Sequence, residues 1–305
     1  MKQITILTIL ISVNLFSVSC VNNSPTLVDE TESTTNPKFI IATPEPYLLV
    51  PNGWVLIPKP NANEIRCGNW SNREWKIDYD NNLKFSKYAY LESEQIAKLP
   101  VKLREFILKN RNIGKGLAGY IHASPTENGW LVGSDAGEWG GNLFWFSEDG
   151  NKKIELLGEN VRGIIHLGEN IFILSGLAHL SSDEGQIHKL ARDEMGTLKT
   201  QSIFNLKGQP QSFAVEGKDS LIIILNNRIL RLNKHGEVKV LKEINFESLY
   251  PNSMAITSSG VIYVGMRLFV ARFIPNEDSY MEEWLVPQDC QKFVARDMQC
   301  LCQKK

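Results

Sequence analysis

The segment from Gly133 to Asn142 holds the densest set of residues that could do chemistry. It reads Gly-Ser-Asp-Ala-Gly-Glu-Trp-Gly-Gly-Asn. Its carboxylates, Asp135 and Glu138, are of the kind that serve as an acid–base pair or as oxygen ligands for calcium. Its glycines permit tight and left-handed turns, so a bulged hairpin with solvated carboxylates explains the same pattern. The spacing of an EF-hand is absent, and the hairpin is the default interpretation.

Histidines offer a second source of chemistry, but the five in this chain are scattered. His122 and His166 fall at similar places in two successive repeats, from which they could face a central channel. Structural histidines with satisfied hydrogen bonds are the default interpretation. The sequence contains no nucleophile elbow, phosphate loop or dinucleotide fingerprint, so no motif specifies a reaction.

Cysteines number five, an odd count for an oxidising compartment. If one of them carries lipid, four remain, which allows two disulfides among Cys67, Cys290, Cys300 and Cys302. A bridge from Cys67 to the C-terminal three would tie the ends of the folded region together. Cys300-Leu301-Cys302 has C-x-C spacing rather than the C-x-x-C spacing of zinc sites, so disulfides are favoured over metal. The pairing itself stays open.

Cys20 follows an export signal. Lys2 gives a positive start, Ile4 to Phe16 is apolar, and Ser17-Val-Ser19 places small residues before the cut. An apolar stretch this short does not span a membrane. The pattern resembles the signal of bacterial lipoproteins, in which the cysteine after the cut is acylated. That family prefers Leu where this chain has Ser17, so plain secretion is the alternative.

These features divide the chain into three parts: residues 1–19 as signal peptide, 20–46 as lipidated cysteine and flexible tether, and 47–305 as the folded domain. The tether is rich in Asn, Ser, Thr and Pro and lacks the apolar residues needed for a core. Val21 is not the Asp that marks inner-membrane retention. We therefore expect an exported, lipid-anchored protein, in the periplasm or at the cell surface, with the outer membrane favoured in a Gram-negative host.

Charge and composition exclude some classes of function. The chain has 33 basic and 34 acidic residues and a net charge of −1, which argues against a nucleic-acid partner. Hydrophobic residues make up 43% and charged residues 22%, the proportions of an ordinary globular domain.

Internal repeats determine the predicted fold. Four apolar runs recur at intervals of 40 to 50 residues, at residues 129–133, 170–174, 220–224 and 260–264. Each follows one β-rich run and precedes two more, so each repeat predicts four strands. Four strands in this length are typical of a β-propeller blade, and apolar second strands are expected where blades pack against each other. We predict an all-β propeller of five or six four-stranded blades.

The repeats resemble those of NHL-type and gluconolactonase-like propellers, most clearly in Pro251 to Ile256 and Gly260 to Gly265. The resemblance covers about residues 119–286. It implies a channel in which gluconolactonase-like enzymes hold a divalent metal such as calcium. Asn252 is the one candidate ligand at the matching place, and partners in the other repeats are missing.

The region before the repeats is less regular. Residues 53–57 match the second-strand pattern, and 74–78 and 83–90 are expected to be further strands. A short helical insertion is predicted near residues 92–113, with Leu103, Phe106 and Ile107 on one face. We expect the tail after Cys290 to return and complete the first blade.

Two functions follow from these features. The first is a membrane-anchored scaffold that binds a protein or small-molecule ligand on its inter-blade loops. The alternative is a metal-dependent lactone or sugar hydrolase, with Asp135, Glu138 and Asn252 as candidate residues. The sequence favours the binding role over an enzyme.

Overall fold

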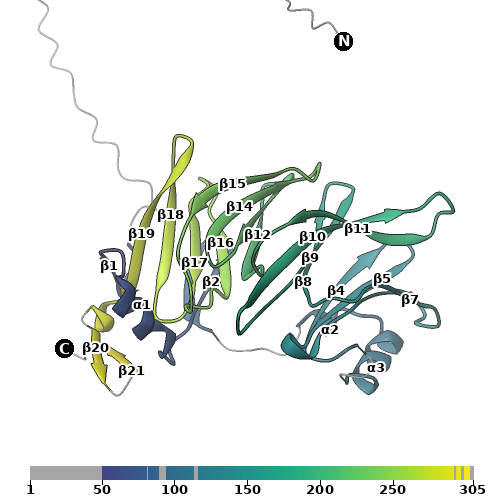
Figure 1. Ribbon diagram of the computed structural model, residues 1–305, viewed down its shortest axis with the longest axis horizontal. Coiled ribbons are helices and arrows are strands. Elements are labelled where there is room, and N and C mark those ends of the chain that lie inside the picture. Colours follow the sequence, from purple (N-terminus) through teal and green to yellow (C-terminus); the bar gives the residue numbers. More distant parts are fainter. Residues whose placement is uncertain are drawn as a thin grey trace, which may run out of the picture. The chain divides into compact units, whose positions relative to one another are not determined.

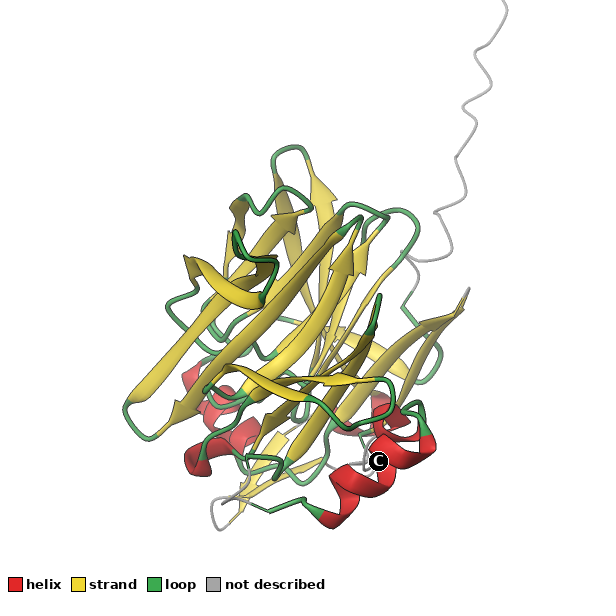
Figure 2. Ribbon diagram, turned by 90° about the vertical axis from the view of Figure 1, so that its right-hand side faces the viewer, coloured by secondary structure: helices red, strands yellow, loops and turns green. Residues whose placement is uncertain are grey.

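The computed structural model describes residues 50–80, 82–88, 94–112, 116–291, 293–296 and 299–302. The signal peptide, Cys20 and the tether lie outside these ranges, so those predictions are untested. Within the described ranges, strands dominate and the few helices are short (Figure 2). None of these helices has the length and apolar character needed to cross a membrane.

The repeats form four antiparallel sheets in the described part of the chain, lying side by side in chain order (Figure 1). The first contains β4 (Tyr120–Thr126), β5 (Gly129–Asp135), β6 (Leu143–Ser147) and β7 (Lys153–Leu157). The second contains β8 (Val161–Leu167), β9 (Asn170–His179), β10 (Ser182–Arg192) and β11 (Leu198–Asn205). The third contains β12 (Ser212–Glu216), β13 (Ser220–Ile224), β14 (Arg228–Asn233) and β15 (Val238–Glu243). The fourth contains β16 (Ser253–Ile256), β17 (Ile262–Gly265), β18 (Val270–Asn276) and β19 (Ser279–Pro287).

This up-and-down arrangement confirms the all-β class and the four-stranded repeats, and it is consistent with a propeller-like fold. The number of blades and the closure of a ring stay predictions. The second strands are buried on both faces, as expected. In β13, Ile222 and Ile224 pack toward the fourth sheet, while Leu221 and Ile223 pack toward the second. Alternate residues of one strand therefore build two neighbouring cores.

Close packing between sheets explains one glycine. A Cβ atom on Gly163 in β8 would lie 2.3 Å from the ring of Phe213 in β12. No side chain fits at this point, so the second and third sheets approach each other only because residue 163 is glycine.

The fourth sheet differs from the expectation in having a fifth strand. β1 (Trp54–Ile57) pairs antiparallel with β19, with Trp54 opposite Pro287 and Ile57 opposite Trp284. The sequence pattern had suggested a second strand for this segment, but it forms an outer edge. The C-terminal tail was expected to complete the first blade, but its strands β20 (Phe293–Arg296) and β21 (Gln299–Cys302) pair with each other in a two-stranded sheet.

A further hairpin, β2 (Trp75–Asp80) and β3 (Asn82–Lys87), covers the opposite edge of the fourth sheet. Ile77 is buried against Ala255 and Tyr263, and its backbone N–H donates to Ser253 Oγ at 2.9 Å. These strands confirm the prediction of two strands here, with observed bounds of 75–80 and 82–87 against the predicted 74–78 and 83–90. Residues 89 and 90 lie outside the described residues.

The predicted helical insertion is present as α2 (Glu94–Ala97) and α3 (Val101–Lys109). Leu103 and Ile107 are buried on the first sheet, while Phe106 is partly exposed and meets the ring of Phe146. A helix that was not predicted, α1 (Ala62–Asn69), begins at a capping box in which Asn61 and Glu64 exchange hydrogen bonds.

Candidate functional site

Asp135 is the last residue of β5 and is 2% exposed. Its Oδ2 lies 2.5 Å from a guanidinium nitrogen of Arg162, and its Oδ1 accepts a hydrogen bond from the N–H of Gly137. Arg162 also donates from Nε to the carbonyl of Pro210 at 3.2 Å. Asp135 therefore has structural partners for both oxygens, and Arg162 joins the first sheet to the segment that enters the third.

Glu138 lies in the 3-10 turn η3 (Gly137–Trp139) between β5 and β6, so the segment is a hairpin loop. The expectation of solvated carboxylates holds for Glu138 and is wrong for Asp135, which is buried. Its carboxylate lies 3.0 Å from Nε2 of His179 in β9, and both side chains are about half exposed. Asp135 and Glu138 thus have different partners, Arg162 and His179. An acid–base or calcium role for the pair stays a prediction.

Asn252 precedes β16 in the fourth sheet, whereas the two carboxylates belong to the first sheet and its loop. Its Oδ1 accepts a hydrogen bond from Ser253 Oγ at 2.8 Å, and its buried Nδ2 has no hydrogen-bond partner in the described part of the chain. Across the same ranges, no three His, Cys, Asp or Glu side chains converge in a way that could hold a metal ion. The calcium expectation therefore gains no support from the residues.

Two of the four cysteines predicted to form disulfides have described side chains. Cys290 is fully buried, and Cys67 packs against the same core cluster. Neither is a free thiol, because the sulfur of each has a bonding partner. The side chains of Cys300 and Cys302 lie outside the described residues, so the pairing stays a prediction.

Ser175, His188 and Glu159 form a cluster whose residue types suggest a nucleophile and its base. Ser175 and His188 are buried, and the Glu159 side chain is partly exposed. Ser175 Oγ donates to Glu159 Oε2 at 2.5 Å, and His188 Nε2 lies 3.0 Å from that Oγ and 3.2 Å from the same carboxylate oxygen. The single hydroxyl proton is used on Glu159, so Nε2 must carry a proton and donate. His188 cannot then accept the serine proton, and Ser175 is 0% exposed. The cluster therefore holds the Glu159 carboxylate in place.

His122 lies on β4, as predicted, close to the Arg162–Asp135 ion pair. Burial lowers the pKa of His122 to about 4; the positive charge of Arg162 adds to this effect, and Asp135 opposes it. The imidazole is therefore neutral at physiological pH.

This shift predicts how stability depends on pH. In the unfolded chain the pKa of histidine is near 6.5, so protonation below that value favours unfolding. The contribution of neutral His122 to the free energy of unfolding is complete above about pH 6.5 and is lost as the pH falls toward 4. Between about pH 6.5 and 4 the free energy of unfolding of the wild type should fall because His122 becomes protonated. We expect His122→Gln to reduce this fall by up to about 3 kcal/mol. Chemical denaturation at several pH values measures it, with exposed His235→Gln as control. Parallel pH profiles for wild type and His122→Gln would contradict the assignment.

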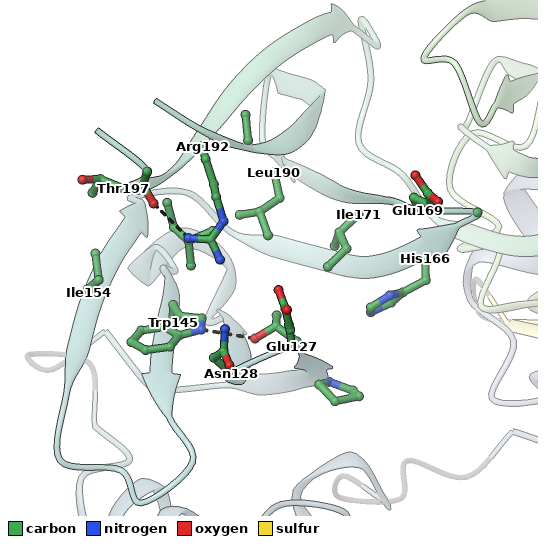
Figure 3. Close-up of a pocket in the computed structure, with 16 residues that line it drawn as sticks. Glu127, Asn128, Trp145, Ile154, His166, Glu169, Ile171, Leu190, Arg192 and Thr197 are labelled. Atoms are coloured by element: carbon green, nitrogen blue, oxygen red, sulfur yellow. Dashed lines mark hydrogen bonds between the residues drawn. The ribbon is translucent and has the colours of Figure 1, made fainter. Parts of the chain in front are cut away.

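A groove of about 920 Å3 lies between the first and second sheets. It opens where the turns β4–β5, β8–β9 and β10–β11 meet. Figure 3 shows Trp145, Asn128 and Glu127 entering from the first sheet, and Leu190, Ile171, Arg192 and His166 from the second. The wall is apolar and its rim is polar, the usual composition of a small-molecule site.

Hydrogen bonds hold the groove residues in position. Trp145 Nε1 donates to Thr126 Oγ1 at 3.2 Å, which fixes the indole against the groove wall. Arg192 donates to the carbonyl of Gly196 at 2.9 Å, and His166 Nε2 lies 2.7 Å from Ser124 Oγ. Burial lowers the pKa of His166, so the imidazole is neutral near pH 7. The groove then carries two carboxylates, Glu127 and Glu169, against one guanidinium.

This groove was not predicted from the sequence. Trp145 lies on the strand β6 like any aromatic core residue, and the polar rim lies in ordinary turns. The available signal was weak: Thr126 to Asn128 and Gly168-Glu169 are polar turns at the same place in two successive repeats.

Comparisons with known proteins give the following matches. No family model matches the sequence, and no curated protein sequence matches it. The extracellular domain of a two-component system from B. thetaiotaomicron aligns at 12% identity and a TM-score of 0.38, over 60% of this chain and 24% of that one. A streptogramin B lyase aligns at 16% identity with a TM-score of 0.35, over 53% of this chain and 52% of the lyase. Regucalcin, a calcium-binding protein from Agrobacterium tumefaciens, aligns at 15% identity with a TM-score of 0.36, over 54% of this chain and 58% of regucalcin. The matches thus span less than two thirds of these known chains.

Proposed function

We propose that this protein is an exported, lipid-anchored binding module that holds a small molecule in the groove between its first and second sheets. The groove itself carries the proposal. Its volume of about 920 Å3 lies within the range of small-molecule sites, and it combines an indole with Ile171 and Leu190 on its wall. Glu127, Asn128, Glu169 and Arg192 provide polar groups around the rim.

The ligand that fits has one flat apolar face and hydrogen-bonding groups around its edge. The indole of Trp145 offers a surface for the apolar face. Carboxylates and an amide accept and donate hydrogen bonds at one side, and the Arg192 guanidinium donates at the other. The alternative of a lactone or sugar hydrolase has no specific observation in its favour, because the described residues place no activated nucleophile or acid–base pair on this groove.

Filling the groove should abolish binding. Ala191 lines the groove, so Ala191→Trp places a large ring where the ligand would lie. We expect at least one compound from a set of monosaccharides, nucleosides and aromatic acids to raise the melting temperature of the wild-type chain, because a ligand stabilises the state that binds it. Thermal shift and tryptophan fluorescence measure both variants.

Ala178→Trp is the matched control, since Ala178 is exposed near the other end of the same hairpin. It should bind like wild type. If every compound that stabilises the wild type stabilises Ala191→Trp equally, the groove is not the binding site.

Lipid attachment at Cys20 has its own test. The export signal, the cysteine at the expected position and the even number of cysteines that remain support it. We expect the wild-type chain to fractionate with membranes and Cys20→Ala to be released as a water-soluble exported form, because the variant has no thiol to acylate. Cell fractionation and mass spectrometry of the mature N-terminus measure the difference. Identical fractionation of both forms would exclude the anchor.

A further inference from the structure

A second cavity, of about 290 Å3, lies at the opposite ends of the same strands. The groove lies near Leu167 of β8 and Arg192 of β10, whereas this cavity lies near Asn160, just before β8, and Gly185 of β10. We call it the acidic cavity. Four glycines line it, so backbone rather than bulky side chains forms much of its wall.

The charges on this cavity are of one sign. Glu159 and Glu184 are among its lining residues, while no lysine, arginine or histidine is. Glu159 is fixed from behind, because its Oε2 accepts hydrogen bonds from Ser175 and His188. Its Oε1 accepts none from the described residues and is available to the cavity.

Asn160 supplies an independent observation that points to a ligand. The residue is 6% exposed and lines the cavity. Its Nδ2 donates to the carbonyl of Gly137 at 2.9 Å, which fixes the orientation of the amide. Its Oδ1 is buried and has no hydrogen-bond partner in the described part of the chain. A buried acceptor without a donor is costly, and a ligand that donates a hydrogen bond there would remove that cost.

The ligand must therefore be positively charged and must donate several hydrogen bonds. A primary ammonium group meets both requirements, since it carries one charge and three N–H donors. The donors can be shared by Asn160 Oδ1 and the two carboxylates. A metal ion is the weaker match, because only two acidic side chains line the cavity and no histidine or cysteine joins them. We infer that the acidic cavity binds a primary ammonium group, carried by a free amine or by a lysine side chain.

Calorimetric titration of the mature full-length chain tests this inference. The probes are cadaverine as a free amine, an acetylated and amidated Gly-Gly-Lys-Gly-Gly peptide as a lysine side chain, 1,5-pentanediol as a neutral analogue, and calcium chloride. We expect cadaverine or the peptide to bind, and Glu184→Gln to weaken that binding roughly fivefold by removing one exposed charge. Glu247→Gln, at an exposed position between β15 and β16, should leave it unchanged.

Each outcome has a defined meaning. Binding of cadaverine alone identifies a free amine, and binding of the peptide alone identifies a lysine side chain. The inference is overturned if neither amine binds at millimolar concentration, if pentanediol binds as tightly as cadaverine, if only calcium binds, or if Glu184→Gln binds amines like wild type. Equal melting temperatures of Glu184→Gln and wild type verify that the variant is folded.

Discussion

Replacing Trp284 with alanine should lower the free energy of unfolding by about 4 kcal/mol. Trp284 is 1% exposed and is among the largest fully buried side chains. Its ring meets Phe246 at 5.4 Å and Phe269 at 5.6 Å between centroids, both edge-on, and its indole N–H donates to Glu282 at 2.9 Å. Alanine would leave a cavity, two aromatic rings without their partner and a carboxylate with one donor fewer. Urea unfolding followed by circular dichroism measures the loss.

Two further variants serve as comparisons for the Trp284→Ala measurement. Trp284→Phe keeps much of the ring volume and should cost less, roughly 1–2 kcal/mol. Trp139→Ala removes the same side chain where it is 65% exposed, and should change stability by less than about 0.5 kcal/mol. If Trp284→Ala and Trp139→Ala have similar effects, the core of the fourth sheet is not packed as described.

Replacing Asp135 with alanine should cost about 3 kcal/mol of stability. The variant leaves the Arg162 guanidinium, which is 25% exposed at its side chain, without the carboxylate that it meets at 2.5 Å. The N–H of Gly137 also loses its acceptor. Because Asp135 opposes the lowering of the His122 pKa, its removal should lower that pKa further. Chemical denaturation and titration of the His122 resonance by NMR measure the two effects.

A double-mutant cycle isolates the ion pair. Arg162→Met alone leaves Asp135 buried without its cation and should also destabilise the chain. The double variant should be more stable than the sum of the two losses predicts, because neither charge then remains unpaired. Additive effects would show that the contact between Asp135 and Arg162 contributes nothing to stability.

Strands were the part of the fold that the sequence predicted best. The apolar runs at 129–133, 170–174 and 220–224 lie in β5, β9 and β13, and the run at 260–264 overlaps β17 from Ile262 onward. All four strands are the second strands of their repeats. Such runs are readable because a strand buried on both faces tolerates few polar residues. The pairing of strands within each repeat followed from the short turns between them.

The candidate site was harder to predict, because it depends on contacts between repeats. Asp135 carries a carboxylate in a glycine-rich loop, and nothing in the sequence indicates that Arg162 lies beside it. The groove arises from the spacing of two sheets rather than from a motif, so Trp145 and Arg192 look like any other strand residues. Burial of the Asn160 amide likewise depends on the loop at Gly137, more than twenty residues earlier in the chain.

Local signals were also missed in the region before the repeats. Asn61 and Glu64 have the spacing of a capping box, which predicts a helix start, and α1 begins there. β1 was predicted as a strand, but its predicted place as the second strand of a repeat was wrong. An apolar run of four residues is compatible with an edge strand as well as with a central strand of a sheet. Its partner, β19, lies at the other end of the folded region.

The pairing of β1 with β19 affects how the chain folds as it is synthesised. Trp54 emerges from the ribosome more than two hundred residues before Pro287, its partner in the sheet. Until then β1 has no neighbour to satisfy its backbone, and the first three sheets can form without it. Closing so long a loop is slow, so completion of the fourth sheet should be a late step in folding. A chain stopped before β19 would present β1 as an unpaired edge, open to strands of other molecules.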